Sequence, residues 1–331
     1  MDATASPAIL EEPLERLVSR WPESRGMLPW DLPFVLPPWL KAWWDAFGRG
    51  WEPRVLTVVS NGRTIGIAPM RIRGQEARII GDVNVCDYLD FIAEPGREEA
   101  FLVALVGHLR QLGVRRLDLR VLRPESVAAR FLPGVAGKMG WKASLVQEDV
   151  SYELQLPSSW DEYLDGLSRH QRHEVRRKLR RLEETEKHLR LRVVEEREAV
   201  CSGFAAFLEL FRSSRPDKDE FMDAPMSAFF HSLVETLAAQ RMLRLYFLEV
   251  DSEIAAGVLC FERGATTYLY NNGFDRRFAS LSIGTLSKLL TIRECIERGQ
   301  SVYDFLKGSE PYKRHLGGKP VPLFRCRVRL S

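Results

Sequence analysis

The sequence lacks the residue patterns that would tie it to a metal, a nucleotide or a disulfide framework. Its five cysteines are scattered, and none belongs to a CxxC or a His/Cys pair. It has no GxGxxG, Walker, HExxH or GxSxG motif, and its six histidines lack metal-ligand spacing. These absences argue against a dehydrogenase, a kinase, a metalloenzyme or a serine hydrolase, and they predict no metal cofactor. Scattered thiols are typical of a reducing compartment.

Segments for export or membrane insertion are also lacking. The first four residues have neither the basic nor the apolar region of a signal peptide. The longest apolar run, 101–109, is interrupted by His108 and is too short to span a bilayer. We therefore expect a cytoplasmic protein with no transmembrane segment.

What is present is an ordinary globular composition with one unusual segment. The chain has 331 residues, of which 45% are hydrophobic and 28% charged, so it can bury a core and is long enough for about two domains. Residues 169–181 contain six Arg, one Lys and one Glu, a local charge of +6. Because the whole chain carries +3, the remainder carries −3. Only one segment is therefore suited to a polyanion.

The predicted elements follow the same order in two halves. Residues 1–36 form a lead-in rich in proline and acidic residues, and a domain boundary is expected near Leu156-Pro157. Periodicity and turn residues predict, in each half, antiparallel strands, then a helix, then a strand. The helices are expected at 39–47, 98–112, 125–139, 159–188, 197–212, 225–240 and 283–298, and the main strands at 54–72, 116–121, 141–156, 243–271, 302–306 and 322–328. A duplicated α+β domain, 37–156 and 157–331, explains this order.

The first candidate site is the start of the helix at Ile283. Arg276 and Arg277 precede it, followed by a run of small residues, and free N–H groups with the positive end of the helix dipole favour a phosphate there. Ser280 or Ser282 can act as the N-cap. Gly284 would let a ligand approach the first turn. The alternative is a capped helix after an ordinary loop.

The second candidate site is the polar end of the strand at 302–306. Tyr303, Asp304, Glu310 and Tyr312 occur there within ten residues. A carboxylate can act as a general base and a tyrosine as a general acid, and dense polar groups are costly to bury unless paired. The alternative is a charged surface loop.

A third feature is the basic helix expected over 169–181. Arg169, His173, Arg176 and Arg180 form one helical stripe, and such like charges favour a compensating anion. An acidic glycan or phospholipid-linked acceptor, an RNA acceptor stem and membrane phosphates are all candidates. The alternative is a solvated helix paired with Glu183, Glu184 and Glu186. No aromatic residues interleave with the arginines, which argues against stacking on single-stranded nucleic acid.

The first two candidate sites together resemble the GNAT superfamily, in particular the cellulose-biosynthesis acetyltransferase (CelD/BcsL-like) branch. The resemblance is carried by Ser282-Ile283-Gly284 and by the run Asp304-Phe305-Leu306-Lys307-Gly308-Ser309-Glu310-Pro311-Tyr312-Lys313. The basic run before Leu182 and the stretch Trp39–Trp44 are also similar, so the resemblance covers most of residues 37–313.

This resemblance implies two tandem GNAT-like domains, each a mixed, mostly antiparallel sheet flanked by helices, as in the Fem peptidyltransferases. It implies acetyl-CoA or another acyl-CoA as co-substrate in the second domain, with its pyrophosphate at Arg277, Ser280, Leu281, Ser282, Ile283, Gly284 and Thr285. The sequence departs from the general phosphate loop, Gln/Arg-x-x-Gly-x-Gly/Ala, because Ser280 and Ser282 replace the small glycines. The first domain has no such helix start, so we expect it to have lost donor binding.

The mechanism implied is attack of an amine, or less often a hydroxyl, on a thioester. Asp304 or Glu310 would then be the base or would orient the amine, and Tyr303 or Tyr312 would protonate the leaving thiolate. The substrate-binding residues expected are Lys307 and Lys313, which would hold an acidic acceptor or a donor phosphate, with Arg176, Tyr270, Asn272, Asp87, Tyr88 and Asp90. For the Asp87–Asp90 stretch, which could line a cleft between the domains, a turn aspartate and a core tyrosine are the alternative.

Three hypotheses follow. The first is a tandem-GNAT N-acyltransferase that moves an acetyl or acyl group to a small-molecule or glycan acceptor, such as a sugar, a polysaccharide precursor or an amino compound. The second is a Fem-like transferase that uses aminoacyl-tRNA, with the 169–181 helix contacting the tRNA. The third is a non-catalytic assembly protein that retains the fold.

Overall fold

The computed structural model describes residues 7–24, 28–184 and 187–331 and divides the chain into two compact units. Unit 1 comprises Met1–Asp149 and Val321–Ser331, and unit 2 comprises Val150–Pro320. The chain passes between the units within β7 (Lys142–Gln155) and returns within β13 (Lys319–Arg329). The sequence had grouped the last residues with the second half. They lie in unit 1 because β13 pairs antiparallel with β6 (Arg116–Leu122).

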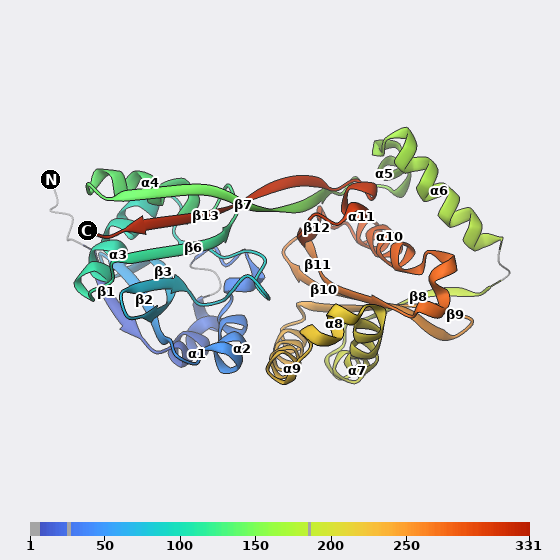
Figure 1. The fold of residues 1–331 in the computed structure, drawn as a ribbon, viewed down its shortest axis with the longest axis horizontal. Coiled ribbons are helices and arrows are strands. Elements are labelled where there is room, and N and C mark those ends of the chain that lie inside the picture. The colour runs from blue at the N-terminus through green and yellow to red at the C-terminus, as the bar shows by residue number, and fades with distance from the viewer. Residues whose placement is uncertain (1–6, 25–27, 185–186) are drawn as a thin grey trace. The chain divides into compact units, whose positions relative to one another are not determined.

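Unit 1 is a mixed sheet with helices packed on it (Figure 1). Its strand order is β1-β2-β3-β4-β6-β13, and β5 also pairs with β3. The remaining elements are β1 (Ala8–Glu12), α1 (Leu14–Ser24), the 3₁₀ helix η1 (Pro33–Val35), α2 (Pro37–Phe47), β2 (Glu52–Ser60), β3 (Arg63–Arg73), β4 (Glu76–Ile79), β5 (Ile92–Ala93), α3 (Glu98–Gln111) and α4 (Val127–Lys138).

The N-terminal segment is not a loose lead-in where the structure describes it. β1 pairs with β2 over Ala8↔Val59 to Glu12↔Val55, and α1 buries Leu14, Leu17 and Trp21. These three residues are spaced for one face of a helix, and their burial stabilises unit 1. The pattern was hidden from the sequence analysis because prolines and acidic residues surround it. Residues 1–6 and 25–27 of the expected lead-in lie outside the described part.

Unit 2 has the strand order β7-β12-β11-β10-β9-β8. Helices α7 and α9 pack on one face of this sheet, and α10 packs on the other (Figure 1). The elements are α5 (Trp160–Gly166), α6 (Arg169–Glu183), β8 (Leu189–Val194), α7 (Arg197–Ser214), α8 (Pro216–Phe221), α9 (Ala224–Ala239), β9 (Leu243–Val250), β10 (Glu253–Arg263), β11 (Thr266–Phe274), the 3₁₀ helix η2 (Arg276–Leu281), α10 (Ile283–Glu297), β12 (Val302–Lys307) and α11 (Pro311–His315).

Both units repeat one arrangement, in which a helix connects two parallel strands. In unit 1 the connection is β4-α3-β6, and in unit 2 it is β11-α10-β12. The strand after each helix also carries a residue in the left-handed region, Val121 with φ 48° and Leu306 with φ 62°. A branched side chain adopts that conformation only under constraint from its surroundings. The expected α+β fold built from two similar halves is therefore confirmed.

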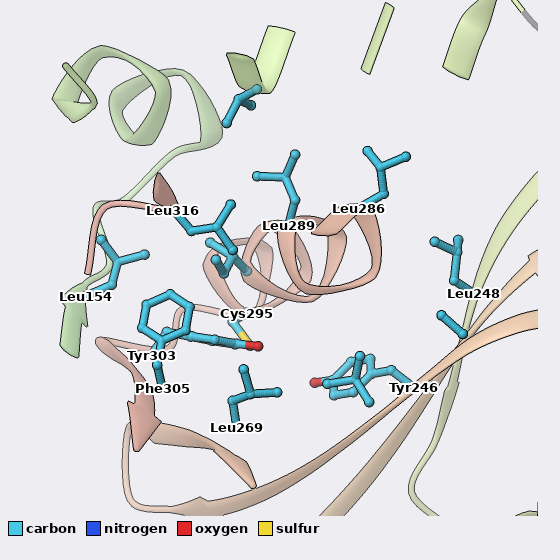
Figure 2. Packing of buried hydrophobic residues seen from close by; sticks show 14 of the residues in the cluster. Leu154, Tyr246, Leu248, Leu269, Leu286, Leu289, Cys295, Tyr303, Phe305 and Leu316 are labelled. Atoms are coloured by element: carbon cyan, nitrogen blue, oxygen red, sulfur yellow. The ribbon is translucent and has the colours of Figure 1, made fainter. Parts of the chain in front are cut away.

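The core of unit 2 forms where α10 covers the sheet (Figure 2). The buried cluster includes Leu286 and Leu289 of α10, Leu269 of β11 and Phe305 of β12. The apolar spacing of the α10 sequence correctly predicted both this helix and its buried face. Beside this core, β12 lies inside the sheet between β7 and β11.

Candidate active site

The two parallel strands of unit 2 separate soon after they meet. Within the described chain, β11 and β12 pair only over Thr266↔Val302, Thr267↔Tyr303 and Tyr268↔Asp304. Both strands continue beyond that point, and β12 shifts its register against β7 between Asp304 and Leu306. Strand ends that diverge leave backbone groups without a neighbouring strand, and such groups are obligatory hydrogen-bonding partners. The candidate site of unit 2 is built around this divergence.

The end of β12 is held in a strained conformation by its own side chains. The Asp304 carboxylate accepts a hydrogen bond of 2.7 Å from the backbone N–H of Leu306, the residue that carries the positive φ. Gly308 follows with φ 110°, where a side chain would be disfavoured. Strained backbone of this kind is often found at functional sites. Asp304 itself is only 1% exposed.

Lys313 closes the turn that follows. Its ammonium lies 3.0 Å from the Leu306 carbonyl, 2.5 Å from the Lys307 carbonyl and 3.2 Å from the Gly308 carbonyl. It also forms an ion pair of 3.0 Å with Glu310, and its side chain is 2% exposed. All its donor capacity is therefore used by protein oxygens, since a lysine has three N–H donors.

Of the predicted acid–base residues, only Glu310 and Tyr312 lie at the surface. The Glu310 side chain is 50% exposed. Burial acts to raise the pKa of Glu310, but the charge and hydrogen bond of Lys313 oppose it, so that the pKa lies below its usual range. Tyr312 is half-buried, and its ring contacts Phe305 and the ammonium of Lys288.

Tyr303, by contrast, lies in the core. It is fully buried near Cys295 (Figure 2), and within the described chain its hydroxyl has no hydrogen-bond partner. Burial raises the pKa of Tyr303 well above its usual range. Such a phenol keeps its proton and has no path to a solvent-exposed substrate. Lys307 is half-buried at the end of β12.

The start of α10 differs in two ways from the expected phosphate loop. Ser282 is the N-cap residue, but with φ 56° its side chain makes no capping hydrogen bond. Gly284 does not leave room for a ligand, because a β-carbon there would lie 2.9 Å from the Phe274 ring. The glycine instead lets the helix pack closely on β11.

The loop before α10 is a 3₁₀ helix, η2, which carries Ser280 and Leu281 near its end. Arg277 is exposed there and pairs with Asp275 at 2.7 Å and Glu253 at 3.0 Å. A donor phosphate would therefore have to compete with two carboxylates for this guanidinium. Ile283, the first residue of α10, is buried, whereas Thr285 in the first turn of the helix is half-buried.

Two lysines of unit 2 that the sequence analysis missed have pKa values lowered by burial. Lys288 of α10 is 5% exposed, and its ammonium donates to the Gly284 carbonyl at 2.6 Å and lies 4.7 Å from the Tyr312 ring centre. Burial lowers the pKa of Lys288 to about 7, helped by the positive charge of Lys218 and opposed by Glu310. Burial also lowers the pKa of Lys218 to about 8, and its ammonium donates to the Asn272 carbonyl. For Lys288, the only signal in the sequence was a lysine inside an apolar helix face.

A cavity of about 400 Å³, here called the α6–α10 pocket, opens beside these groups. It is lined by α6, α10 and α11 through His170, Gln171, Glu174, Val175, Lys178, Thr285, Leu289, Tyr312, His315 and Leu316. Its volume suits a small ligand or part of a cofactor. It brings together two predicted site residues, Thr285 and Tyr312, with the inner face of the basic helix.

The other predicted substrate residues of unit 2 lie apart from this pocket. Tyr270 stacks between Phe230 and Phe261, with ring centres 5.7 and 4.6 Å away. Asn272 contributes its backbone carbonyl to Lys218. Both residues belong to β11, whose free end is the part that diverges from β12.

The outer face of α6 is strongly basic. Arg169, Arg172, His173, Arg176, Arg177 and Arg180 line an open depression of about 390 Å³. Glu174 pairs with Arg177 at 2.8 Å, and Glu184 lies 3.8 Å from Arg180. For Arg169 and Arg176, the described part of the chain contains no carboxylate partner. Of the predicted acidic partners, Glu186 lies outside the described residues.

The substrate-binding residues predicted in the first half make contacts that support the fold of unit 1. Asp90 accepts hydrogen bonds from the N–H groups of Val127 at 2.7 Å and Ala128 at 3.0 Å, and so caps α4. Burial raises the pKa of Asp90 to about 7, although these bonds oppose the shift. Tyr88 is fully buried, and the guanidinium of Arg123 lies 4.8 Å from its ring centre. Asp87 is half-buried beside them.

Across 7–24, 28–184 and 187–331, no helix combines the length and apolar character needed to cross a membrane. The same residues contain no group of three His, Cys, Asp or Glu side chains placed to hold a metal ion.

A known protein family matches the part of the sequence that forms the candidate site of unit 2. Residues 169–314 match the family model of the acetyltransferase (GNAT) domain, a stretch that includes α6, α10, β12 and most of α11. Most of unit 2 is therefore similar to the acetyltransferase (GNAT) domain. No curated protein matches the sequence significantly.

The fold of the whole chain is similar to several solved structures. FemX aligns with a TM-score of 0.63 over 96% of both chains at 13% identity. A conserved protein of unknown function from Bacteroides thetaiotaomicron aligns with a TM-score of 0.60 over 95% of this chain and 97% of that chain at 11% identity. L-PGS from Bacillus licheniformis aligns with a TM-score of 0.53, over 87% and 90% of the two chains, at 9% identity. At such identities the likeness shows a shared fold.

Proposed function

We propose that unit 2 transfers an acetyl or other acyl group from acyl-CoA to an amine or hydroxyl acceptor. The observation that carries the proposal is the meeting of the α10 start with the α6–α10 pocket, since Thr285 and Tyr312 line one cavity. The N-terminus of a helix favours phosphate, so the donor pyrophosphate is placed at α10. The thioester would then extend toward the diverging ends of β11 and β12.

The chemistry requires three changes of charge. The amine loses a proton as it attacks, the thioester oxygen becomes an oxyanion, and the thiolate leaves and gains a proton. Glu310 is accessible and remains ionised, which suits it to orienting the ammonium and accepting its proton through water. Tyr312 lines the pocket and is placed to protonate the thiolate. A backbone N–H of a diverging strand is the proposed oxyanion donor.

The buried members of the predicted set have supporting roles in this proposal. Asp304 and Lys313 hold the strained turn that carries Glu310 and Tyr312. Tyr303 packs beneath β12. Lys288, whose pKa is lowered to about 7 by burial, is a second group that can release a proton near neutral pH beside Tyr312.

The acceptor class rests on resemblance and charge. The resemblance to the cellulose-biosynthesis branch favours a sugar or a polysaccharide precursor. The unpaired Arg176 on the outer face of α6 suits an acceptor that carries a carboxylate or a phosphate.

Titration calorimetry with acetyl-CoA, followed by thiol release in the presence of amine and sugar acceptors, tests the proposal. We expect wild-type protein to bind acetyl-CoA, and Glu310→Gln and Tyr312→Phe to bind it normally but to transfer about 10²–10⁴-fold more slowly. Glu297→Gln, which removes an exposed carboxylate at the far end of α10, is the matched control and should bind acetyl-CoA normally and transfer at the wild-type rate. Full transfer by both variants would contradict the assigned roles. Absence of acetyl-CoA binding would contradict the proposal that acyl-CoA is the donor.

A Fem-like transferase that uses aminoacyl-tRNA is the second candidate, favoured by the basic outer face of α6. It predicts tRNA binding that weakens steeply with salt, and a smaller slope of log K against log salt for Arg176→Gln. Binding of tRNA without binding of acetyl-CoA would favour this candidate. Binding of neither would favour a non-catalytic assembly protein.

A further inference from the structure

Unit 1 contains a charged cavity that the proposed chemistry of unit 2 does not use. It has a volume of about 160 Å³ and lies against β3, β4 and β6. Its wall includes three arginines and two aspartates, Arg71, Arg78, Arg120, Asp82 and Asp118. The wall therefore carries a net formal charge of +1. The sequence analysis expected this half to have lost donor binding and named only Asp87, Tyr88 and Asp90 as its substrate-binding residues.

Arg71 is the unusual member of the wall. It is 7% exposed, and its guanidinium is held between Trp43 and Trp51, 4.7 and 4.5 Å from the two ring centres. Stacking uses the two faces of the guanidinium and fixes its plane. The five N–H donors lie in that plane and are not used by the rings.

One of those donors has no acceptor in the described part of the chain. It is the buried Nε of Arg71, and no carboxylate there lies within ion-pair distance of the group. Burial lowers the pKa of Arg71 to about 10, so the group remains charged at neutral pH. A buried charge without a partner is costly, because its hydration is lost and nothing replaces it.

The other charges of the wall are already paired. Asp118 accepts two hydrogen bonds of 2.7 Å from Arg325 and lies 3.4 Å from Arg78. Arg120 donates to Glu148 at 2.9 Å. Asp82 accepts from the Trp43 indole N–H at 3.0 Å and from a backbone N–H at 2.8 Å. The charge of Asp82 raises the pKa of Arg71, but no ion pair joins the two groups in the described part of the chain.

We propose that this cavity binds one oxyanion group, a carboxylate or a phosphate, that accepts hydrogen bonds from the Arg71 guanidinium. The fork of the guanidinium matches the paired oxygens of such a group. The net charge of the wall matches a single negative charge. The volume suits one such group of a ligand and not a nucleotide. The site belongs to unit 1, and its existence does not depend on acyl transfer by unit 2.

Thermal unfolding of the full chain with added anions tests the site. Inorganic phosphate and acetate are compared at constant ionic strength, with chloride as reference, so the two arms separate a phosphate from a carboxylate ligand. We expect at least one of them to raise the Tm of the wild type by roughly 2–4 °C near saturation. Arg71→Met should abolish the rise, and Arg71→Lys should weaken binding about tenfold, because lysine lacks the fork.

Arg73→Met is the matched control. Arg73 lies on the same strand and stacks on the same Trp51 ring at 4.5 Å, but it is exposed and does not line the cavity. The variant should keep the full anion-dependent rise. An equal rise in wild type and Arg71→Met would overturn the proposal, as would no rise with either anion.

If Arg71→Met does not fold, NMR spectroscopy of the wild-type protein still tests the site directly. In the wild type, the ¹⁵N resonance of the Arg71 Nε should shift on addition of the anion that raises the Tm, while that of Arg73 stays in place. An unchanged Arg71 resonance with both phosphate and acetate would refute the site.

Discussion

Replacing Thr285 by glutamate should slightly raise the free energy of unfolding and should weaken the binding of the acyl donor. Thr285 is the third residue of α10 and lines the α6–α10 pocket. A carboxylate in the first turn of a helix stabilises it by about 0.3–1 kcal/mol, so the unfolding free energy should rise slightly. A donor phosphate at the same helix start would meet that carboxylate. Two unit charges about 5–6 Å apart, at an effective dielectric constant of about 20, repel by about 3 kcal/mol.

That repulsion corresponds to a loss of about 100-fold in acetyl-CoA affinity. Calorimetry on Thr285→Glu and on Thr285→Gln, which has the same shape without the charge, measures the electrostatic part alone. Urea unfolding of both variants verifies that the fold is intact. The loss should shrink at high salt, since the pocket is open to solvent. Equal affinities of the two variants would mean that the donor phosphates do not lie at the start of α10.

Three further predictions concern stability and pH. Gly273→Ala would place a β-carbon 2.5 Å from the Leu210 backbone, where α7 meets β11. The free energy of unfolding, measured in urea, should therefore fall by about 2–4 kcal/mol. A loss below about 0.5 kcal/mol would show that the backbone adjusts. Because burial lowers the folded-state pKa of Lys288 to about 7, below the unfolded value of about 10.4, wild type should gain stability relative to Lys288→Met between about pH 7 and 10. Urea titrations at pH 6.5 and 9 measure this difference, and the opposite trend would contradict burial of the ammonium. Asp90→Ala should unfold more easily by about 1–2 kcal/mol, because two N–H groups of α4 lose their acceptor. Since the folded pKa of Asp90 is raised to about 7, the wild-type advantage should be larger at pH 5 than at pH 8, and an advantage that grows with pH would refute the raised pKa.

Local pattern was enough to predict most of the elements. The helices expected at 98–112, 197–212, 225–240 and 283–298 correspond closely to α3, α7, α9 and α10. Each has an apolar face with helical spacing, and that spacing survives in the folded chain because the same face meets a sheet. The segment before Pro37 was misjudged, because prolines and acidic residues surround its buried residues Leu14, Leu17 and Trp21.

The candidate site was only partly accessible to such reasoning. The sequence identified Glu310 and Tyr312 as candidate acid–base residues, because a high density of polar residues at a strand end is a local property. It could not show that Tyr303 points into the core, or that Lys313 is enclosed by three carbonyls of a strained turn. Lys288 was overlooked because periodicity treats a lysine in an apolar face as an interruption.

By itself, the sequence determined the α+β class, the repeated order of elements and the region of unit 2 where polar residues gather, because these depend on neighbours a few residues apart. Only the tertiary structure decided which of those residues are buried, which charges already have partners and which cavity they line. The difference has a physical cause. Burial and pairing depend on groups from distant segments, as when Trp43 and Trp51 enclose Arg71, and no local pattern records that meeting.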